Sequence, residues 1–511
     1  MDALHYLGLL VSILLIIIYK VNSNRRIQHK NLPPSPPSVP IIGHFHLLIK
    51  TPIHQALTNF SNEYGPIFLL RLGSRPTLVL SSRAAIEECF PKNDIIFSNR
   101  PLLPSRKILE YNHTITAPYG DHWRMWRRFS LIEIFSKRRL QMSSEFRAEE
   151  IRFVAKYLYY KNYFKGVTKV DVKSFFYKLT FNMVMKMVAG KRCFEYEELE
   201  DSETNKGKLD DLLEMFSPLV NVALGDYFPF LRWLTYYGEE RRLLKIHKKK
   251  DTFIQALIDA HQNTTSSLTS VDDRKTSQTI IGVMLKLKES EPEFYTNDLI
   301  KGIIQVMLLA GTYSTVTTMD WVVSRLISHP DVLKNARDEI DNHVGSSRLM
   351  NNTDLAKLPY LHCVITETLR LSQSGIVELR ESSEDCTVGE YHIPRGTQLL
   401  VDGRHMHRDP ELWTEPERFK PERFLESEEE KGMFKFIIFG IGRRICPGED
   451  LAMRIMALSL GTLIQCFDWE EARYESQEGP LKTNQNKPEN IRSPEIVFRP
   501  RKAITEVLAQ L

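Results

Sequence analysis

One cysteine near the C-terminal end of the chain lies in the segment that most constrains the fold. Residues 439–448 read Phe-Gly-Ile-Gly-Arg-Arg-Ile-Cys-Pro-Gly and precede an apolar, helical run. Glycines let a backbone approach a large flat cofactor. Cationic neighbours and a helix N-terminus favour the thiolate, which is the form of cysteine that binds metals. A lone cysteine is usually a buried structural residue, but the pattern Phe-x-x-Gly-x-Arg-x-Cys-x-Gly favours Cys446 as a ligand of a metal-containing cofactor.

Composition limits the class of protein. The chain has 511 residues, a hydrophobic fraction of 42% and a formal net charge of +4. The hydrophobic fraction fits a globular core, and the small net charge argues against a nucleic-acid binder, which would carry a concentrated basic surface. Six scattered cysteines are too few for a disulfide framework and indicate a reducing compartment.

The cysteine segment resembles the haem-binding loop of the cytochrome P-450 superfamily, in which the thiolate is the axial ligand of the haem iron. The resemblance implies a mainly α fold with a minor β region, the cytochrome P-450 fold, built as a single catalytic domain. It implies haem b as the cofactor, with Cys446 on the iron and Phe439 in the cofactor-binding loop. It also implies electrons from NADPH, delivered by NADPH-cytochrome P-450 reductase.

Further residues match motifs of the same family that bind the haem carboxylates. Trp123 and Arg127 match its Trp-x-x-x-Arg helix and lie one turn apart, so that both can reach a propionate. Arg380 and Arg444 are the other propionate candidates, since a guanidinium pairs with a carboxylate through two parallel hydrogen bonds.

Two neighbours of these residues, Arg124 and Arg128, have two interpretations. They form either a solvated helix face or a basic patch that docks an acidic reductase through electrostatic attraction.

Three charged residues match the family's structural core. Glu367 and Arg370 form a Glu-x-x-Arg pair on one helix face, in a helix that opens at Pro359. Arg423 would complete a buried Glu-Arg-Arg set behind the cysteine loop. The motif Pro-Glu-Arg-Phe occurs at both 416–419 and 421–424, and the spacing to the preceding tryptophan favours the later copy.

A long apolar segment predicts the helix that crosses the haem. Thr296 is an expected N-cap, and the pattern continues to Ser328, before a proline. A helix of about 32 residues is roughly 48 Å long, which is enough to cross the body of the protein. Its middle, residues 310–315, reads Ala-Gly-Thr-Tyr-Ser-Thr.

This middle segment departs from the family's usual pattern of glycine, any residue, an acid and a threonine. We predict that Gly311, Thr312 and Ser314 are the catalytic residues, with Ser314 relaying protons through ordered water. Tyr313 replaces the acid that normally takes part in proton delivery. A phenol of pKa ~10 relays protons less well at neutral pH than a carboxylate. The change indicates either a compensated monooxygenase or altered oxygen chemistry.

Other departures lie near the expected substrate and cofactor faces. The usual prolines are absent from residues 371–374, residues 402–406 read Asp-Gly-Arg-His-Met in place of Asn-x-Trp-Ala-Ile, and Ile438 stands where a proline is usual. His405, within this set, is expected to be a surface or supporting residue. These changes fit a specialised substrate, a weakened enzyme or a membrane haem protein without catalysis.

The N-terminal segment predicts a membrane anchor. Residues 3–19 carry no charge and are rich in leucine and isoleucine, and Lys20, Arg25 and Arg26 follow. Positive charge after the apolar run places the body in the cytosol. We therefore expect a transmembrane signal anchor at 1–20, a basic and proline-rich hinge at 21–43 and a haem-thiolate catalytic domain at 44–511. The protein would be a single-pass protein of the endoplasmic reticulum membrane.

Strands are expected in two places. Residues 67–72 and 77–81 flank a Gly-Ser-Arg-Pro turn and form a predicted hairpin, and short β-rich runs return at 386–402. Most of the remaining chain has helical periodicity.

The finer resemblance is to plant A-type microsomal members, in particular the isoflavone-hydroxylase-like branch, on the basis of residues 386–389 and 451–454. It implies a monooxygenase acting on a small lipophilic plant specialised metabolite: a phenolic, lignan, alkaloid or terpenoid. The alternative is a haem-thiolate isomerase, dehydratase or oxidative ring-closing enzyme without net oxygen insertion, suggested by Tyr313 and Ser314. Substrate contacts are expected from residues 102–118, 212–231, 308–315, 374–379 and 479–484.

Overall fold

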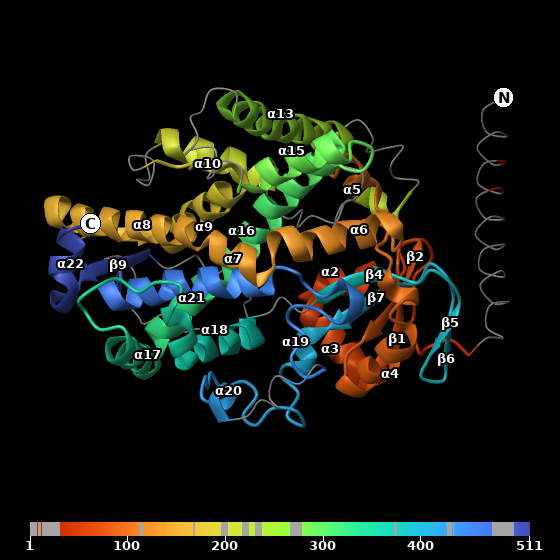
Figure 1. Ribbon diagram of the computed structural model, residues 1–511. Coiled ribbons are helices and arrows are strands. Elements are labelled where there is room, and N and C mark those ends of the chain that lie inside the picture. Colours follow the sequence, from red (N-terminus) through yellow and green to blue (C-terminus); the bar gives the residue numbers. More distant parts are fainter. Residues whose placement is uncertain are drawn as a thin grey trace.

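The computed structural model describes residues 31–111, 116–166, 169–195, 203–216, 224–229, 238–265, 278–372, 376–426, 434–472 and 495–511, and the single residues 8, 12 and 432. Helices make up most of the described chain, and a few short strands lie toward both ends of it (Figure 1). The expected mainly α fold with a minor sheet is therefore confirmed.

The helices are α2 (Phe45–Lys50), α3 (Ile53–Tyr64), α4 (Arg83–Asn93), α5 (Pro104–Leu109), α6 (Asp121–Phe129), α7 (Lys137–Met142), α8 (Ser144–Lys165), α9 (Val172–Ala189), α10 (Glu203–Phe216), α11 (Leu224–Tyr227), α13 (Glu239–Thr265), α15 (Ile280–Ser290), α16 (Asn297–Ser328), α17 (Pro330–His343), α18 (Pro359–Ser372), α19 (Gly403–Met406), α20 (Arg423–Glu426), α21 (Glu449–Cys466) and α22 (Thr505–Ala509). Short 3-10 turns include η2 (Ile96–Ser98), η5 (Asp354–Lys357) and η7 (Gly442–Arg444), and η3 (Ser130–Ile134) is a π-turn.

The long helix α16 is the axis of the fold. The Thr296 hydroxyl accepts a hydrogen bond from the backbone N–H of Leu299, and the helix runs to Ser328, as predicted. It packs against α9, α18 and α21, and Figure 1 shows it crossing the middle of the molecule. A helix that is apolar on all sides must be surrounded by protein or by lipid. Among the described helices α16 alone is long and apolar enough to span a membrane, and it is mostly buried inside the protein, as a core helix is.

The main sheet has the strand order β1-β2-β7-β4, with bounds Ile67–Leu72, Arg75–Leu80, Gln398–Asp402 and Ile376–Glu381. The predicted hairpin is present, because β1 and β2 pair antiparallel around Gly73. Strand β7 lies between β2, to which it runs parallel, and β4, to which it runs antiparallel. All five residues of β7 are buried, as expected for a central strand.

Two smaller sheets complete the β structure. The hairpin of β5 (Cys386–Val388) and β6 (Tyr391–Ile393) falls in the predicted 386–402 region. A three-stranded sheet, β3-β9-β8, joins Lys169–Asp171 to Glu495–Pro500 and Phe467–Glu471. This last sheet was not predicted, because its pairing depends on contacts between distant parts of the chain.

The described part of the predicted hinge lies against the body. The backbone N–H of Leu69 donates to the carbonyl of Pro34, and the N–H of His392 donates to that of Asn31. His44 is buried, accepts from the N–H of Arg71 through Nδ1 and donates to the carbonyl of Pro36 through Nε2. The predicted anchor and residues 21–30 lie outside the described residues, apart from residues 8 and 12.

Candidate active site

The cysteine loop connects η7 to α21. The backbone N–H of Cys446 donates to the carbonyl of Phe439 at 2.7 Å, which closes the loop. Gly440 and Gly442 have φ angles of 85° and 63°, a region that glycine enters without strain. Cys446 is exposed and is not part of a disulfide. Its sulfur therefore lies, outside any disulfide, at the end of a tight, glycine-dependent loop.

The N-terminus of α21 lies beside this sulfur. Gly448 is the N-cap residue, and a Cβ atom at that position would lie 3.9 Å from Sγ of Cys446. The positive end of a helix dipole stabilises a nearby anion. This placement favours the thiolate form of Cys446, as the sequence suggested.

Three arginines and a tryptophan converge on the same loop. Arg127 donates to the carbonyl of Ile445 at 2.6 Å, and Arg380 donates to the carbonyl of Ile441. The guanidinium of Arg444 lies 4.4 Å from the ring centre of Trp123. Burial lowers the pKa of Arg127, and the charge of Cys446 partly opposes that shift, as expected for an arginine close to a thiolate. The four residues predicted to hold propionates are therefore grouped around the cysteine.

This donor set fits haem b. Haem b has an iron that takes an axial protein ligand, and its porphyrin carries two carboxylates. The loop offers one exposed cysteine, and three arginines lie in the loop or contact it. Within the part of the chain that the structure describes, no group of three or more His, Cys, Asp or Glu side chains is arranged to hold a bare metal ion.

The middle of α16 presents an open face. Ala310 and Ser314 are exposed although most of the surrounding helix is buried, and they lie one turn apart on the same side. The Ser314 hydroxyl donates to the carbonyl of Ala310 at 2.8 Å. Its oxygen keeps lone pairs that can accept a hydrogen bond from water.

The other two predicted catalytic residues lie elsewhere on the helix. Thr312 is completely buried, and its hydroxyl has no hydrogen-bond partner in the described structure. A Cβ atom on Gly311 would lie 3.4 Å from Val184 of α9, an ordinary van der Waals contact, so this residue lies at the interface between α16 and α9. The geometry favours Ser314 among the three, and the catalytic roles of all three stay predictions.

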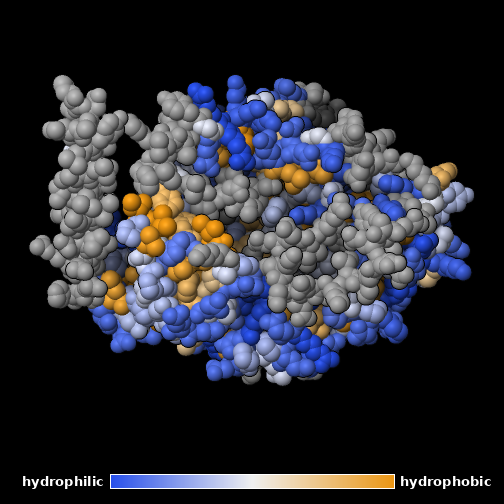
Figure 2. Space-filling model, turned by 180° about the vertical axis from the view of Figure 1, so that it is seen from behind, coloured by the Kyte–Doolittle hydropathy of each residue, from blue (hydrophilic) through white to orange (hydrophobic). Residues whose placement is uncertain are grey.

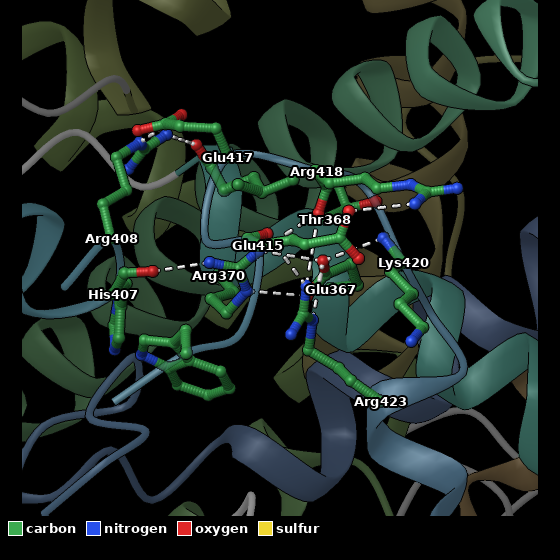
Figure 3. Close-up of polar contacts among 12 residues, drawn as sticks. Glu367, Thr368, Arg370, His407, Arg408, Glu415, Glu417, Arg418, Lys420 and Arg423 are labelled. Carbon is green, nitrogen blue, oxygen red and sulfur yellow. Dashed lines mark hydrogen bonds and ion pairs between the residues drawn. The ribbon is translucent and has the colours of Figure 1, made fainter. Parts of the chain in front are cut away.

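The Glu-Arg-Arg set is assembled as the sequence suggested (Figure 3). Arg370 binds both carboxylate oxygens of Glu367, at 2.7 and 2.9 Å, and Nε of Arg423 lies 3.1 Å from Oε1 of Glu367. Arg423 comes from the later Pro-Glu-Arg-Phe copy and its side chain is 6% exposed, whereas that of Arg418 from the earlier copy is 68% exposed. The later copy therefore supplies the buried arginine.

His407, which no sequence motif identifies, joins this set to the segment that leads into the cysteine loop. The carbonyl of His407 accepts from Arg370 at 2.5 Å, and its ring Nε2 accepts from the N–H of Ile437 at 3.3 Å. Complete burial, together with charge repulsion from Arg370 and Arg408, lowers the pKa of His407 to about 3. His407 is therefore neutral. Its place directly before Arg-Asp-Pro gave no signal that distinguished it from His405.

The expected substrate segments are described only in part. Helix α5, from the 102–118 segment, is held at its start by Ser105, which donates to Asp226 of the 212–231 segment at 2.6 Å. Beyond its end, Tyr111 donates to Asp251 of α13 at 2.8 Å, and Lys301 of α16 pairs with the same carboxylate. Residues 112–115, 217–223, 230–231, 374–375 and 479–484 lie outside the described residues.

Comparison with known proteins decides the family. The family model for Cytochrome P450 matches residues 33–494. The chain belongs to the cytochrome P450 family. The protein is therefore a P450 monooxygenase that uses haem b, receives electrons from NADPH through a reductase and acts on a small molecule.

The similar proteins are plant P450s. Cytochrome P450 81E8 of Medicago truncatula is 42% identical over 91% of this chain and 91% of its own length. Isoflavone 3'-hydroxylase of the same plant is 41% identical, over 93% and 95%. The (+)-piperitol/(+)-sesamin synthase of Sesamum radiatum is 40% identical, over 99% and 98%. The resemblance to the isoflavone-hydroxylase-like branch is thereby confirmed.

The two Pro-Glu-Arg-Phe arginines form a matched pair for mutation. Arg423→Ala removes a cation from the buried Glu367 carboxylate and should lower the unfolding free energy by about 3 kcal/mol. Arg418→Ala keeps the backbone carbonyl that Arg370 and Arg423 use, and should change stability by less than about 0.5 kcal/mol. Urea unfolding of the haem-bound protein measures both. Equal losses would contradict the assignment of Arg423 to the buried set.

The low pKa of His407 in the folded protein predicts a loss of stability in acid. Its pKa falls from 6.5 to about 3 on folding, so below pH 6.5 the unfolded chain takes up a proton that the folded protein does not. Stability is therefore lost as the pH falls from about 6.5 toward about 3, by about 2 kcal/mol at pH ~5. His407→Gln should flatten this dependence in urea unfolding at pH ~7 and pH ~5. An unchanged slope would show that His407 is already protonated in the folded state.

Proposed function

We propose that this P450 oxidises a lipophilic plant metabolite of the phenolic or lignan class. The observation that carries the proposal is the similarity, over nearly the full chain, to relatives named for isoflavone 3'-hydroxylation and for piperitol and sesamin synthesis. Alkaloids and terpenoids, the other classes that the sequence suggested, have no such support among these relatives.

In this proposal several residues in and around the cysteine loop have defined tasks. Haem b, when bound, supplies the activation of dioxygen and the oxidation of the substrate. Cys446 ligates the haem iron, and Phe439 is part of the loop that binds the haem. Trp123, Arg127, Arg380 and Arg444 bind its propionates. The grouping of all three guanidiniums around one loop supports these roles.

Ser314 is the proposed proton-handling residue. Its hydroxyl proton is held by the carbonyl of Ala310, and its oxygen faces the open side of α16. A water that donates a hydrogen bond to that oxygen can transfer a proton to it, and the hydroxyl then releases its own proton toward the site. Because Tyr313 stands in place of a carboxylate, ordered water has to supply the proton that a carboxylate would deliver.

The polar contacts around α5 suggest how the substrate is enclosed. Hydrogen bonds and an ion pair join α5 and the residue Tyr111 beyond it to α11, α13 and α16: Ser105 binds Asp226, and Tyr111 and Lys301 both bind Asp251. These contacts satisfy polar groups outside the site and leave apolar side chains to contact the ligand. We propose that this arrangement selects a mid-sized lipophilic molecule.

The domain organisation and location are also proposed. The apolar run at 3–19 with the following cations supports a single-pass anchor, a hinge at 21–43 and a cytosolic catalytic domain on the endoplasmic reticulum. Apolar side chains gather at the end of the molecule that carries α2 and the β1–β2 hairpin (Figure 2). Ile41, in the hinge, and Ile49, shortly after it, are 55% and 81% exposed, which suits contact with lipid.

A cationic surface on α6 is the proposed docking site for the reductase. Arg124, Arg128 and Arg443 line a pocket of about 330 Å³ between α6 and the cysteine loop. The exposed apolar residues Leu131 and Ile132 border it. Positive charge beside the haem-binding loop would steer an acidic electron donor to the side from which the cofactor is reached.

A second candidate function follows from Tyr313. Without an acid in the middle of α16, the same haem site suits an isomerase, a dehydratase or an oxidative ring-closing enzyme that inserts no oxygen. A haem protein without turnover is the weakest alternative.

A reconstituted assay tests the substrate class. The full chain is co-expressed with a plant reductase, and phenolics and lignans are screened by spectral shift and product mass against alkaloids and terpenoids. We expect NADPH-dependent oxidation of a phenolic or lignan. Turnover without NADPH and reductase would favour the isomerase alternative. Haem binding with no substrate-dependent use of NADPH would favour the non-catalytic one.

Substitution of Tyr313 tests the proton relay. Tyr313→Asp restores the carboxylate and should raise the yield of product per NADPH consumed, because proton delivery then no longer depends on water alone. Tyr313→Phe is the matched control and should leave the yield within about two-fold of the parent, since a phenol contributes little at neutral pH. An Asp variant with unchanged rate and coupling would remove the support for this relay.

A further inference from the structure

We propose that Asp94 is a positioning residue of the haem site, which holds Arg380 and the cysteine loop in fixed relation to each other. The proposal deepens the proposed function, because it rests on Arg380 as a propionate ligand and Cys446 as the iron ligand. Asp94 lies at the end of α4, far in sequence from both.

The Asp94 carboxylate joins three elements. Its Oδ1 accepts from Nη1 of Arg380 on β4 at 3.1 Å. Its Oδ2 accepts from the backbone N–H of Arg443 in η7 at 3.1 Å, and the Arg443 side chain lies 3.5 Å from the same oxygen. One carboxylate therefore ties α4 to both the candidate propionate ligand and the cysteine loop.

Arg380 is oriented by the contacts that surround it. Its side chain is completely buried, its guanidinium lies 4.8 Å from the ring centre of Phe90, and its second amino group donates to the carbonyl of Ile441. A buried guanidinium needs an anion or hydrogen-bond acceptors to offset its desolvation. Asp94 supplies the charge and Ile441 the carbonyl, so the plane of the guanidinium is set from both sides.

The position of Asp94 is unfavourable for its own helix. It is the C-cap of α4, where the helix dipole presents partial negative charge. A carboxylate there destabilises the helix end unless cations compensate. The two arginines provide that compensation, which shows that the carboxylate serves the loop and β4 more than it serves α4.

Gly442 makes the close approach possible. A Cβ atom at this position would lie 2.3 Å from Oδ1 of Asp94, and the residue has a φ angle of 63°. The glycine of the cysteine motif is therefore needed for two reasons: the left-handed backbone and the space that the Asp94 carboxylate occupies.

The test is made on the full-length protein with haem bound, purified in detergent. Asp94→Asn keeps the size of the side chain and removes its charge. We expect haem transfer to excess apomyoglobin to be about ten-fold faster, the effect of losing one charge-assisted hydrogen bond. The midpoint potential of the iron should rise, because a negative charge beside the site is removed.

Gly442→Ala separates geometry from charge. The added methyl group displaces the carboxylate but leaves its charge, so haem loss should accelerate while the rise in potential is much smaller than in Asp94→Asn. Arg443→Ala keeps the backbone N–H that Asp94 accepts from, and should leave haem loss within about two-fold of the parent.

Asp354→Asn is the matched control for general destabilisation. Asp354 is buried, whereas the Asp94 side chain is 22% exposed. The Asp354 carboxylate accepts two bonds from Arg348 and one from the N–H of Asn351, and these contacts are all local to η5. It should lower the unfolding midpoint and leave both haem loss and potential unchanged.

Two outcomes would overturn the proposal: unchanged haem loss and potential in Asp94→Asn, or equal changes in Asp354→Asn. If the parent protein itself lacks the spectrum of a thiolate-ligated haem, the assignment of Cys446 fails instead. The two failures are therefore distinguishable.

Discussion

Arginine side chains that donate hydrogen bonds to backbone carbonyls fix the conformation of the loop that carries the Cys446 sulfur. Arg127 and Arg380 donate to carbonyls of the cysteine loop, and Arg444, which is part of the loop, donates to the carbonyls of Ser98 and Ala117. Behind the loop, Arg370 and Arg423 donate to carbonyls of the 407–418 segment while they share the Glu367 carboxylate. Irregular backbone is usually the mobile part of a protein, because its carbonyls face water. Here buried or half-buried guanidiniums satisfy those carbonyls, which suits an irregular segment to the support of a cofactor.

The same interactions explain which parts of the site could be predicted from sequence. The cysteine loop, the Glu367–Arg370 pair and the bounds of α16 depend on residues close together in the chain, so their spacing is informative. Arg423 was found because its motif has a fixed distance from Trp413. Two copies of that motif lie five residues apart, and the burial of Arg423 agrees with the copy that the spacing favours.

Contacts between distant residues could not be predicted. Asp94 is 286 residues from Arg380 and 349 from Arg443, and nothing near it suggests a role in the loop. His407 bridges Arg370 and Ile437 through a backbone carbonyl and a ring nitrogen, which no local pattern encodes. Residue type also could not show which hydroxyl of α16 is exposed. Thr312 and Ser314 are two residues apart, so they lie on different sides of the helix, and Thr312 is buried while Ser314 is exposed.

The P450 family assignment and the geometry of the loop both point to one proposed bond, between the Cys446 sulfur and the haem iron. Its most direct test is the absorption spectrum of the reduced, carbon-monoxide-treated protein beside that of Cys446→Ala. A thiolate ligand donates electron density that shifts the carbonyl band to long wavelength. We expect that band in the parent protein and its loss in Cys446→Ala. The same band in both proteins would contradict the assignment of Cys446 as the iron ligand.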